Sequence, residues 1–145
     1  MVQRIAWIFA IAGLVPFAGA TVALLWGESH VRVPAIAAMV TFAAIVISHL
    51  GGVEAGLALR EEFGSEKTRA TALFLSTVPS LAAWGVLWLP SPQWQLGASI
   101  GLFVAVWGAD LWLAHSGLIP SWFVDLRTAA TAVVAVILGI ALYLL

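Results

Sequence analysis

The sequence predicts an all-α membrane protein in which five transmembrane helices form a polytopic bundle, with the N-terminus inside and the C-terminus outside. Of its 145 residues, 63% are hydrophobic and 9% are charged, whereas a soluble domain is about 45–50% apolar and about 25% charged. A chain this short leaves much of its surface exposed, so the apolar excess has to face lipid. Five apolar segments, each near the roughly 20 residues that cross a hydrocarbon core, contain this excess.

The five segments fill the chain and predict a single integral membrane domain, residues 1–145. The first begins like a signal peptide, with small residues at Ala18–Ala20. Its apolar run continues to Trp26, which is long enough to span, so we expect an uncleaved helix. The predicted spans are Ile5–Trp26, Pro34–Leu59, Ala70–Leu89, Leu96–Ala114 and Ser121–Leu145.

The breaks between the spans carry residues that end or begin helices. Pro34 and Pro120 suit the first turn of a helix, where no backbone donor is lost. Gly64 can end the second helix, and Ser65 can cap the third. The predicted loops are therefore residues 27–33, 60–69, 90–95 and 115–120.

The positions of Lys and Arg predict the orientation. The N-terminus, the second loop and the region of the fourth loop carry five basic residues, and the opposite side carries only Arg32. Cytoplasmic segments are enriched in Lys and Arg, so this asymmetry places the N-terminus in the cytoplasm or the mitochondrial matrix. The five residues are Arg4, Arg60, Lys67, Arg69 and Arg127.

Small residues recur every four positions in two of the predicted helices, and such rows allow helix backbones to approach closely in lipid. We expect both rows to be packing seams. They are Ala44, Ser48, Gly52 and Gly56 in the second helix, and Gly97, Gly101, Ala105 and Gly108 or Ala109 in the fourth.

Pro16 and Pro79 lie near the middle of the first and third spans, where each removes a helix hydrogen bond and favours a kink. Ser76, Thr77 and Ser80 surround Pro79, and their hydroxyl groups can satisfy carbonyls that the proline frees. Interrupted helices can also mark a transporter's central site, so we include these hydroxyls in the candidate polar cluster.

Charged side chains inside a span are costly and indicate a partner or a function. By the 1.5 Å helix rise, Glu54, Asp110 and Arg127 all fall in the cytoplasmic third of the bilayer. We predict that Asp110 pairs with Arg127 and ties the fourth helix to the fifth, because a guanidinium suits bidentate contact with a carboxylate. The alternatives are contact of Arg127 with lipid headgroups and a functional site.

We expect no cofactor and no metal. The chain has no cysteine, which excludes thiolate and iron–sulfur chemistry. His49 and His115 fall at different depths, so they do not suit two-histidine haem ligation, and zinc lacks close ligand spacings. His49 lies about 140° around the helix from Glu54, but it remains part of the candidate cluster.

Eight tryptophans suggest the tryptophan-rich sensory protein family, but its spaced Trp and Pro signatures are missing. A series of motifs along the whole chain instead resembles the transmembrane protein 69 family, also named domain of unknown function 3429. The motifs are GLVPF (Gly13–Phe17), ISHLGGVEAGLAL (Ile47–Leu59), STVPSLAAWGVLWLP (Ser76–Pro90), the aspartate of GADLWL (Asp110) and IPSWFVDLRTAAT (Ile119–Thr131).

The resemblance implies a bacterial inner (plasma) membrane or a mitochondrial inner membrane, and it implies no activity, cofactor or catalytic residue. The sequence departs from the family pattern at one place. The pattern has a large residue at the position of Ala55 with a basic residue before it, whereas that preceding residue here is Glu54. No binding role of that site is therefore carried over.

Three function classes are compatible with these observations. The first is an accessory or assembly subunit of a larger membrane complex, which suits a small chain without catalytic motifs. The second is a binder or carrier of a small hydrophobic or weakly acidic ligand, such as a lipid or a quinone. The third is an intramembrane enzyme using His49, Glu54 or Asp110, and this class is the least supported. We expect the bilayer and other membrane subunits as partners, but no nucleic acid, because no basic face is clustered.

Overall fold

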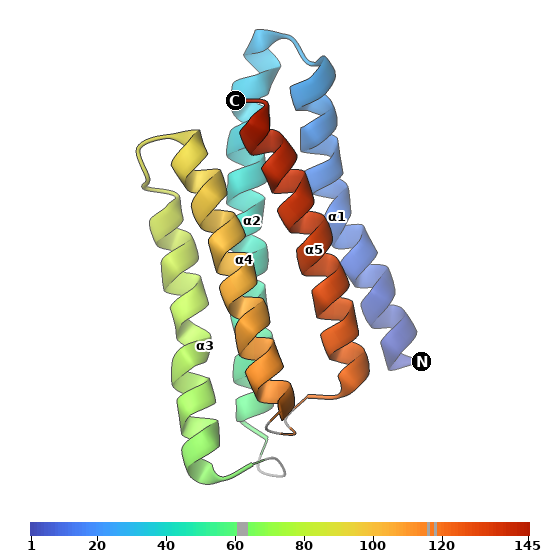
Figure 1. The fold of residues 1–145 in the computed structure, drawn as a ribbon, viewed down its shortest axis with the longest axis vertical. Helices are drawn as coiled ribbons and strands as arrows, with labels where there is room; N and C mark the ends of the chain where they lie inside the picture. The colour runs from blue at the N-terminus through green and yellow to red at the C-terminus, as the bar shows by residue number, and fades with distance from the viewer. Residues whose placement is uncertain (61–63, 116, 118) are drawn as a thin grey trace.

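Five helices account for nearly all of the computed structural model, which describes residues 1–60, 64–115, 117 and 119–145 (Figure 1). No strand occurs in these ranges, so the all-α class is confirmed. Consecutive helices run in opposite directions along the long axis of the molecule. The helices are α1 (Val2–Trp26), α2 (Ser29–Ala58), α3 (Glu66–Val86), α4 (Pro92–His115) and α5 (Ser121–Tyr143).

Helix α2 is the centre of the bundle, because it packs against α1, α3 and α4. Helix α3 lies at one edge of the bundle and α1 at the other, and α5 packs against α1 and α4. The ring of Phe17 on α1 meets Phe42 on α2 edge to face at 5.2 Å and Phe103 on α4 at 6.4 Å. Phe17 and Phe103 are buried and Phe42 is half-buried, so aromatic packing joins three helices in the core.

Four helices in the described part of the chain are long and apolar enough to cross a membrane: α1, α2, α4 and α5. Helix α3 is the exception to the expected five. Its first turn carries Glu66, Lys67 and Arg69, and hydroxyl-bearing residues follow along its length, so its hydropathy is lower. The described residues therefore form five helices, of which four are long and apolar enough to span a membrane.

The helix ends differ from the predicted spans because a helix can continue beyond the apolar segment into the polar region. Helix α2 already begins at Ser29, so residues 29–33 are helical and Pro34 lies inside the helix, not in its first turn. Helix α2 ends at Ala58, so Gly64 does not end it. Gly64 instead lies directly before Ser65, the N-cap of α3, and has a positive φ of 72°. Pro120 is the N-cap of α5 and precedes its first turn.

The predicted cap of α3 is confirmed, since the Ser65 hydroxyl accepts a hydrogen bond from the Thr68 amide at 3.2 Å. Helix α3 spans Glu66–Val86 instead of residues 70–89. Helix α4 begins at Pro92, four residues earlier than predicted, because proline suits a first helical position. The predicted loop 90–95 is correspondingly shorter.

The two rows of small residues form seams only in part: Ala44 at the start of the α2 row is buried in the core, whereas the glycines of both rows have free space around them. Gly52 and Gly56 on α2 are exposed, and a Cβ atom added at either glycine would meet nothing within 4 Å. The same holds for Gly101 and Gly108 on α4. The close approach is at Gly51, where an added Cβ would lie 2.5 Å from the backbone oxygen of Ser76 on α3. The α2–α3 seam therefore lies one residue away from the predicted row.

Candidate functional site: a buried ion pair beside an apolar cavity

The core of the site is an ion pair between α4 and α5. The Nε of Arg127 donates to Oδ2 of Asp110 at 2.6 Å, and the two residues are 7% and 2% exposed. A short distance between a guanidinium and a carboxylate is typical of a charge-assisted hydrogen bond. A second bond joins the same two helices: the indole nitrogen of Trp107, about one turn before Asp110 on α4, donates to Oγ1 of Thr128, which follows Arg127 on α5, at 2.9 Å. The sequence-based pairing of α4 with α5 is thus present in the structure.

Glu54 supplies a second carboxyl group to this cluster from α2. It is 4% exposed, and the charged groups that act on it are Asp110 and Arg127. Its Oε1 is buried without a hydrogen-bond partner in the described part of the chain, and the same is true of Nη2 of Arg127. The cluster therefore contains one unused acceptor and one unused donor. Buried polar atoms are nearly always paired, so two unpaired atoms of complementary type in one cluster call for an explanation.

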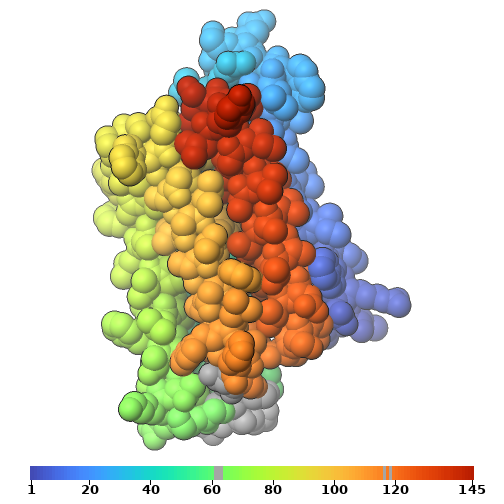
Figure 2. Space-filling view, in the orientation of Figure 1, coloured from blue at the N-terminus to red at the C-terminus, as the bar shows by residue number. Residues whose placement is uncertain are grey.

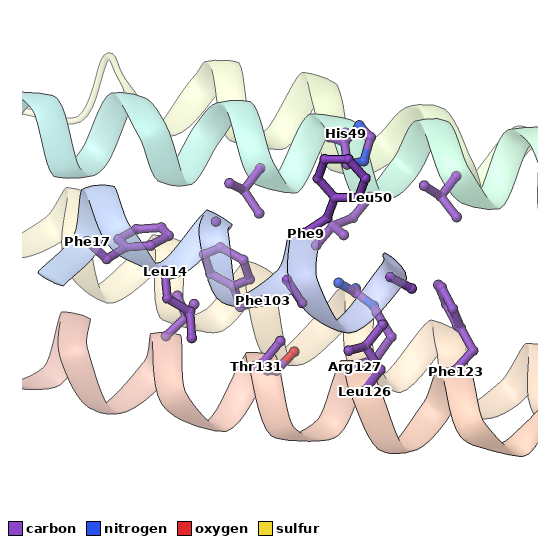
Figure 3. A pocket seen from close by; sticks show the side chains of 17 residues that line it. Phe9, Leu14, Phe17, His49, Leu50, Phe103, Phe123, Leu126, Arg127 and Thr131 are labelled. Atoms are coloured by element: carbon purple, nitrogen blue, oxygen red, sulfur yellow. The ribbon is translucent and has the colours of Figure 1, made fainter. Parts of the chain in front are cut away.

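A cavity of about 300 Å³ lies beside the ion pair, between α1, α2 and α5 (Figure 3). The space is open because several residues around it are alanine or glycine, and larger apolar side chains form most of the wall. Phe103 of α4 closes one side. The volume is at the lower end of the range for small-molecule sites, which are about 300–1,000 Å³ and mainly apolar.

Three polar residues line this cavity: His49 on α2, and Arg127 and Thr131 on α5. Figure 3 shows His49 on α2 and Arg127 on α5 at a similar level along the cavity, on opposite walls, with Phe17 toward one end and Phe123 toward the other. Asp110 and Glu54 do not line the cavity. Arg127 therefore joins the buried carboxyl groups on one side to the apolar space on the other.

The hydroxyl residues near Pro79 are not part of this arrangement. Ser76 Oγ donates to the Leu73 carbonyl at 2.7 Å, and Thr77 Oγ1 donates to the Phe74 carbonyl at 2.8 Å. These bonds stay within the preceding turn of α3, and neither reaches the carbonyl of Leu75, which is the one that Pro79 frees. Ser80, also on α3, lines a shallow groove between α2 and α3 that is separate from the cavity beside the ion pair. Within the described residues, none of the three bonds to the charged cluster.

Two residues of the cavity wall, Arg127 and His49, belong to the polar cluster predicted from the sequence, but the cavity itself was not predicted. The space exists because side chains are small at Ala6, Ala10 and Gly13 on α1 and at Ala130 on α5. Alanine and glycine are frequent in membrane helices, so these positions carry no distinctive signal. Only the relative rotation of α1 and α5 makes them face one another.

Known proteins that are similar to this chain support the family resemblance of its sequence motifs. Transmembrane protein 69 of Xenopus tropicalis is 36% identical to the chain over 126 residues, which are 85% of this chain and 47% of that protein. The chain thus spans about half the length of this curated relative. No solved structure matches the chain. The family model described as a protein of unknown function (DUF3429) matches residues 2–143, and the chain belongs to this family of membrane proteins.

Proposed function

We propose that this protein binds a small, mainly apolar molecule in the cavity between α1, α2 and α5. The observation that carries the proposal is the environment of Arg127. Its Nη2 is buried and unpaired, and its side chain lines a cavity of about 300 Å³ that is otherwise nearly apolar. An unpaired guanidinium nitrogen needs an acceptor, and an apolar wall needs an apolar ligand. A molecule with an acceptor at one end satisfies both requirements when the Arg127 side chain, whose Nη2 is buried in this structure, turns toward it.

The geometry limits the size of this ligand. From Arg127 to Val134, the wall of α5 is seven residues long, which is about 10 Å at the rise of an α-helix. The apolar part of the ligand is therefore of medium length, comparable with a short acyl chain or a single ring with a tail. The hydroxyl of Thr131 and the ring of His49 offer further polar contacts near its head.

A substitution that fills the cavity tests the proposal. Gly13 lines the cavity, and a Cβ atom added there would meet nothing within 4 Å. Gly13→Leu should therefore fold normally and lower binding at least tenfold by occupying the ligand's space. The probe is a medium-chain alkyl methyl ketone with a diazirine at the far end of its chain. The protein is placed in lipid nanodiscs, and photo-crosslinking competed by unlabelled ketone gives the affinity.

Gly19→Leu is the matched control, because Gly19 lies on the same helix, is exposed and also has free space around it. Each variant gains helix propensity to a similar extent, so only the cavity distinguishes them. We expect crosslinks in wild type and in Gly19→Leu at residues of α1 and α5 that line the cavity. Equal crosslinking in both variants would reject the cavity as the binding site.

We also propose that α3 crosses the membrane, which gives five crossings in one integral membrane unit. Helices α2 and α4 point the same way along the bundle, and α3 connects the end of α2 to the beginning of α4 (Figure 1). If both neighbours cross in the same direction, the connecting helix has to cross in the other. The 21 residues of α3 are about 31 Å long, which matches the hydrocarbon thickness. Its exposed face carries Phe74, Val78, Leu81 and Trp84.

Five crossings place the two termini on opposite sides. The basic residues at the end of the bundle that contains the N-terminus favour a cytoplasmic or matrix N-terminus, in a bacterial inner or mitochondrial inner membrane. Attaching a cysteine-reactive, membrane-impermeant label to cysteines introduced at Gln3 and Gln93 tests this orientation. We expect labelling of intact cells or mitoplasts at Gln93 alone.

A second candidate function is that of a subunit within a larger membrane complex. It is favoured by the exposed glycines Gly52 and Gly56 on α2 and Gly101 and Gly108 on α4, around which an added Cβ finds free space. Exposed small residues allow a helix of another protein to approach closely. Extraction in a mild detergent followed by native sizing tests this candidate. A particle no larger than the monomer would count against it.

A further inference from the structure

The charged cluster has an imbalance that the ion pair alone does not resolve. Glu54 and Asp110 contribute two carboxyl groups, whereas Arg127 is the single cation among the described residues that acts on them. With both carboxyl groups ionised, the cluster would carry one excess negative charge while all three side chains are at least nine-tenths buried. An uncompensated buried charge costs several kcal/mol. One additional proton would make the cluster neutral.

The hydrogen bonds indicate where this proton resides. Asp110 receives the short bond from Arg127, which is the contact expected of an ionised carboxylate. Glu54 has no hydrogen bond at Oε1 and thus lacks the donors that a buried carboxylate requires. A neutral carboxyl group tolerates this environment much better. Glu54 is therefore the group that suits the proton.

The position of Arg127 connects this proton to the cavity. Its Nε is used by Asp110, while its Nη2 is unpaired. A Glu54 carboxylate without its proton would attract this free nitrogen, because its Oε1 is an unused acceptor in the same cluster. The guanidinium would then be turned away from the cavity. With the proton in place, no carboxylate at Glu54 holds Nη2, and the guanidinium is free to turn toward a ligand in the cavity.

We propose that ligand binding in the cavity is linked to a proton held by Glu54, with the protonated protein as the binding form. This inference rests on the proposed function, since it assigns a regulation to the same cavity. By linkage, a proton that favours the ligand is itself bound more tightly when the ligand is present. The affinity for the ligand should fall as the pH rises through the range in which Glu54 loses its proton.

The other charged groups near the cluster do not provide this link. On α3, Nε of Arg69 donates to the Ala58 carbonyl at 3.3 Å, and Glu66 and Lys67 are exposed. Asp125 on α5 and Arg4 on α1 are also exposed. His49 lines the cavity, so it needs its own control.

The test uses the same diazirine ketone, because a ketone does not titrate and any pH dependence belongs to the protein. In nanodiscs the wild-type affinity should weaken with rising pH, by at most about tenfold per pH unit for one linked proton. Glu54→Gln should keep the strong binding of the acidic wild type at every pH. Asp125→Asn should retain both the wild-type affinity and its pH dependence. His49→Gln changes the cavity wall, so its affinity is compared only with itself, and it should retain the pH dependence. A pH-independent wild type, or a dependence that persists in Glu54→Gln, would overturn the inference.

Infrared spectroscopy gives a readout that needs no ligand. A protonated carboxyl group has a carbonyl stretch that shifts in heavy water, and we expect such a band in wild type and in Asp125→Asn but not in Glu54→Gln. Absence of the band in wild type would refute the proton on Glu54 even if the ketone binds. If the band is present and no ketone binds at any pH, the proposed function fails and with it the linkage, while the proton site stands.

Discussion

Arg127→Gln is expected to lower the apparent melting temperature of the detergent-solubilised protein by about 10 °C or more. The substitution removes the cation that pairs with Asp110, and it is the single cation in the described part of the chain that acts on both Asp110 and Glu54. Removing one member of a buried ion pair costs about 3–5 kcal/mol, and each kcal/mol shifts the melting temperature of a chain of this size by roughly 2–4 °C. The fraction of monodisperse protein after heating, measured by size exclusion, gives the result.

Asp110→Asn should be less damaging than Arg127→Gln, although it still destabilises the protein. Here Glu54 remains beside Arg127 and can become its counter-ion, so the cluster keeps one charge of each sign. Arg4→Gln and Asp125→Asn are the matched controls, because both residues are exposed and exposed substitutions change stability by about 0.5 kcal/mol or less. Wild-type heat resistance in both Arg127→Gln and Asp110→Asn would contradict a structural role of the pair.

Gly51→Ala is the second substitution with a large expected effect, because it disrupts the seam between α2 and α3. A Cβ atom at this position would lie 2.5 Å from the Ser76 backbone oxygen. A backbone atom cannot move aside as a flexible side chain can, so the two helices must separate. Overpacking of this kind costs about 1–3 kcal/mol, and Gly51→Leu should prevent stable folding. Thermal denaturation in detergent measures both variants.

Gly52→Ala should stabilise the protein, whereas Gly51→Ala destabilises it, although the two residues are neighbours on α2. The methyl group added at Gly52 meets nothing within 4 Å, and alanine is about 0.5–1 kcal/mol more favourable than glycine inside a helix. The contrast between the two variants isolates helix contact from helix propensity. If Gly52→Ala were the more harmful of the two, the seam would follow the row of small residues that the spacing suggested.

The seam also illustrates what the sequence could and could not predict. Five helical segments follow from the apolar runs because a backbone in lipid must satisfy its own hydrogen bonds. The side of α2 that meets α3 does not follow, because Gly51 and Gly52 are chemically identical. Their difference lies only in the rotation of α2, which packing along its whole length determines. Spacing patterns therefore predicted that seams exist, but not their positions.

The charged cluster was more predictable than the cavity. Asp110 and Arg127 are unlike their apolar surroundings, and the helix rise alone places them at one depth. The role of Glu54 could not be derived, since its distance from the pair depends on how α2 leans against α4. The cavity could not be predicted at all, because it reflects side chains that are missing at Gly13 and Ala130.

The way α1 joins the bundle has a consequence for how binding is measured. Its buried residues, Phe17 and Leu24, both lie in its second half, and the helix diverges from α2 toward the N-terminus, where its first residues stand clear of the molecule (Figure 2). Phe9 and His49 line the cavity and are also exposed, so the cavity reaches the lateral surface. The proposed ligand would then enter from the bilayer, and its mole fraction among the surrounding lipids would govern how much of the cavity is occupied. Diluting the aqueous phase would leave it full, and adding lipid would empty it.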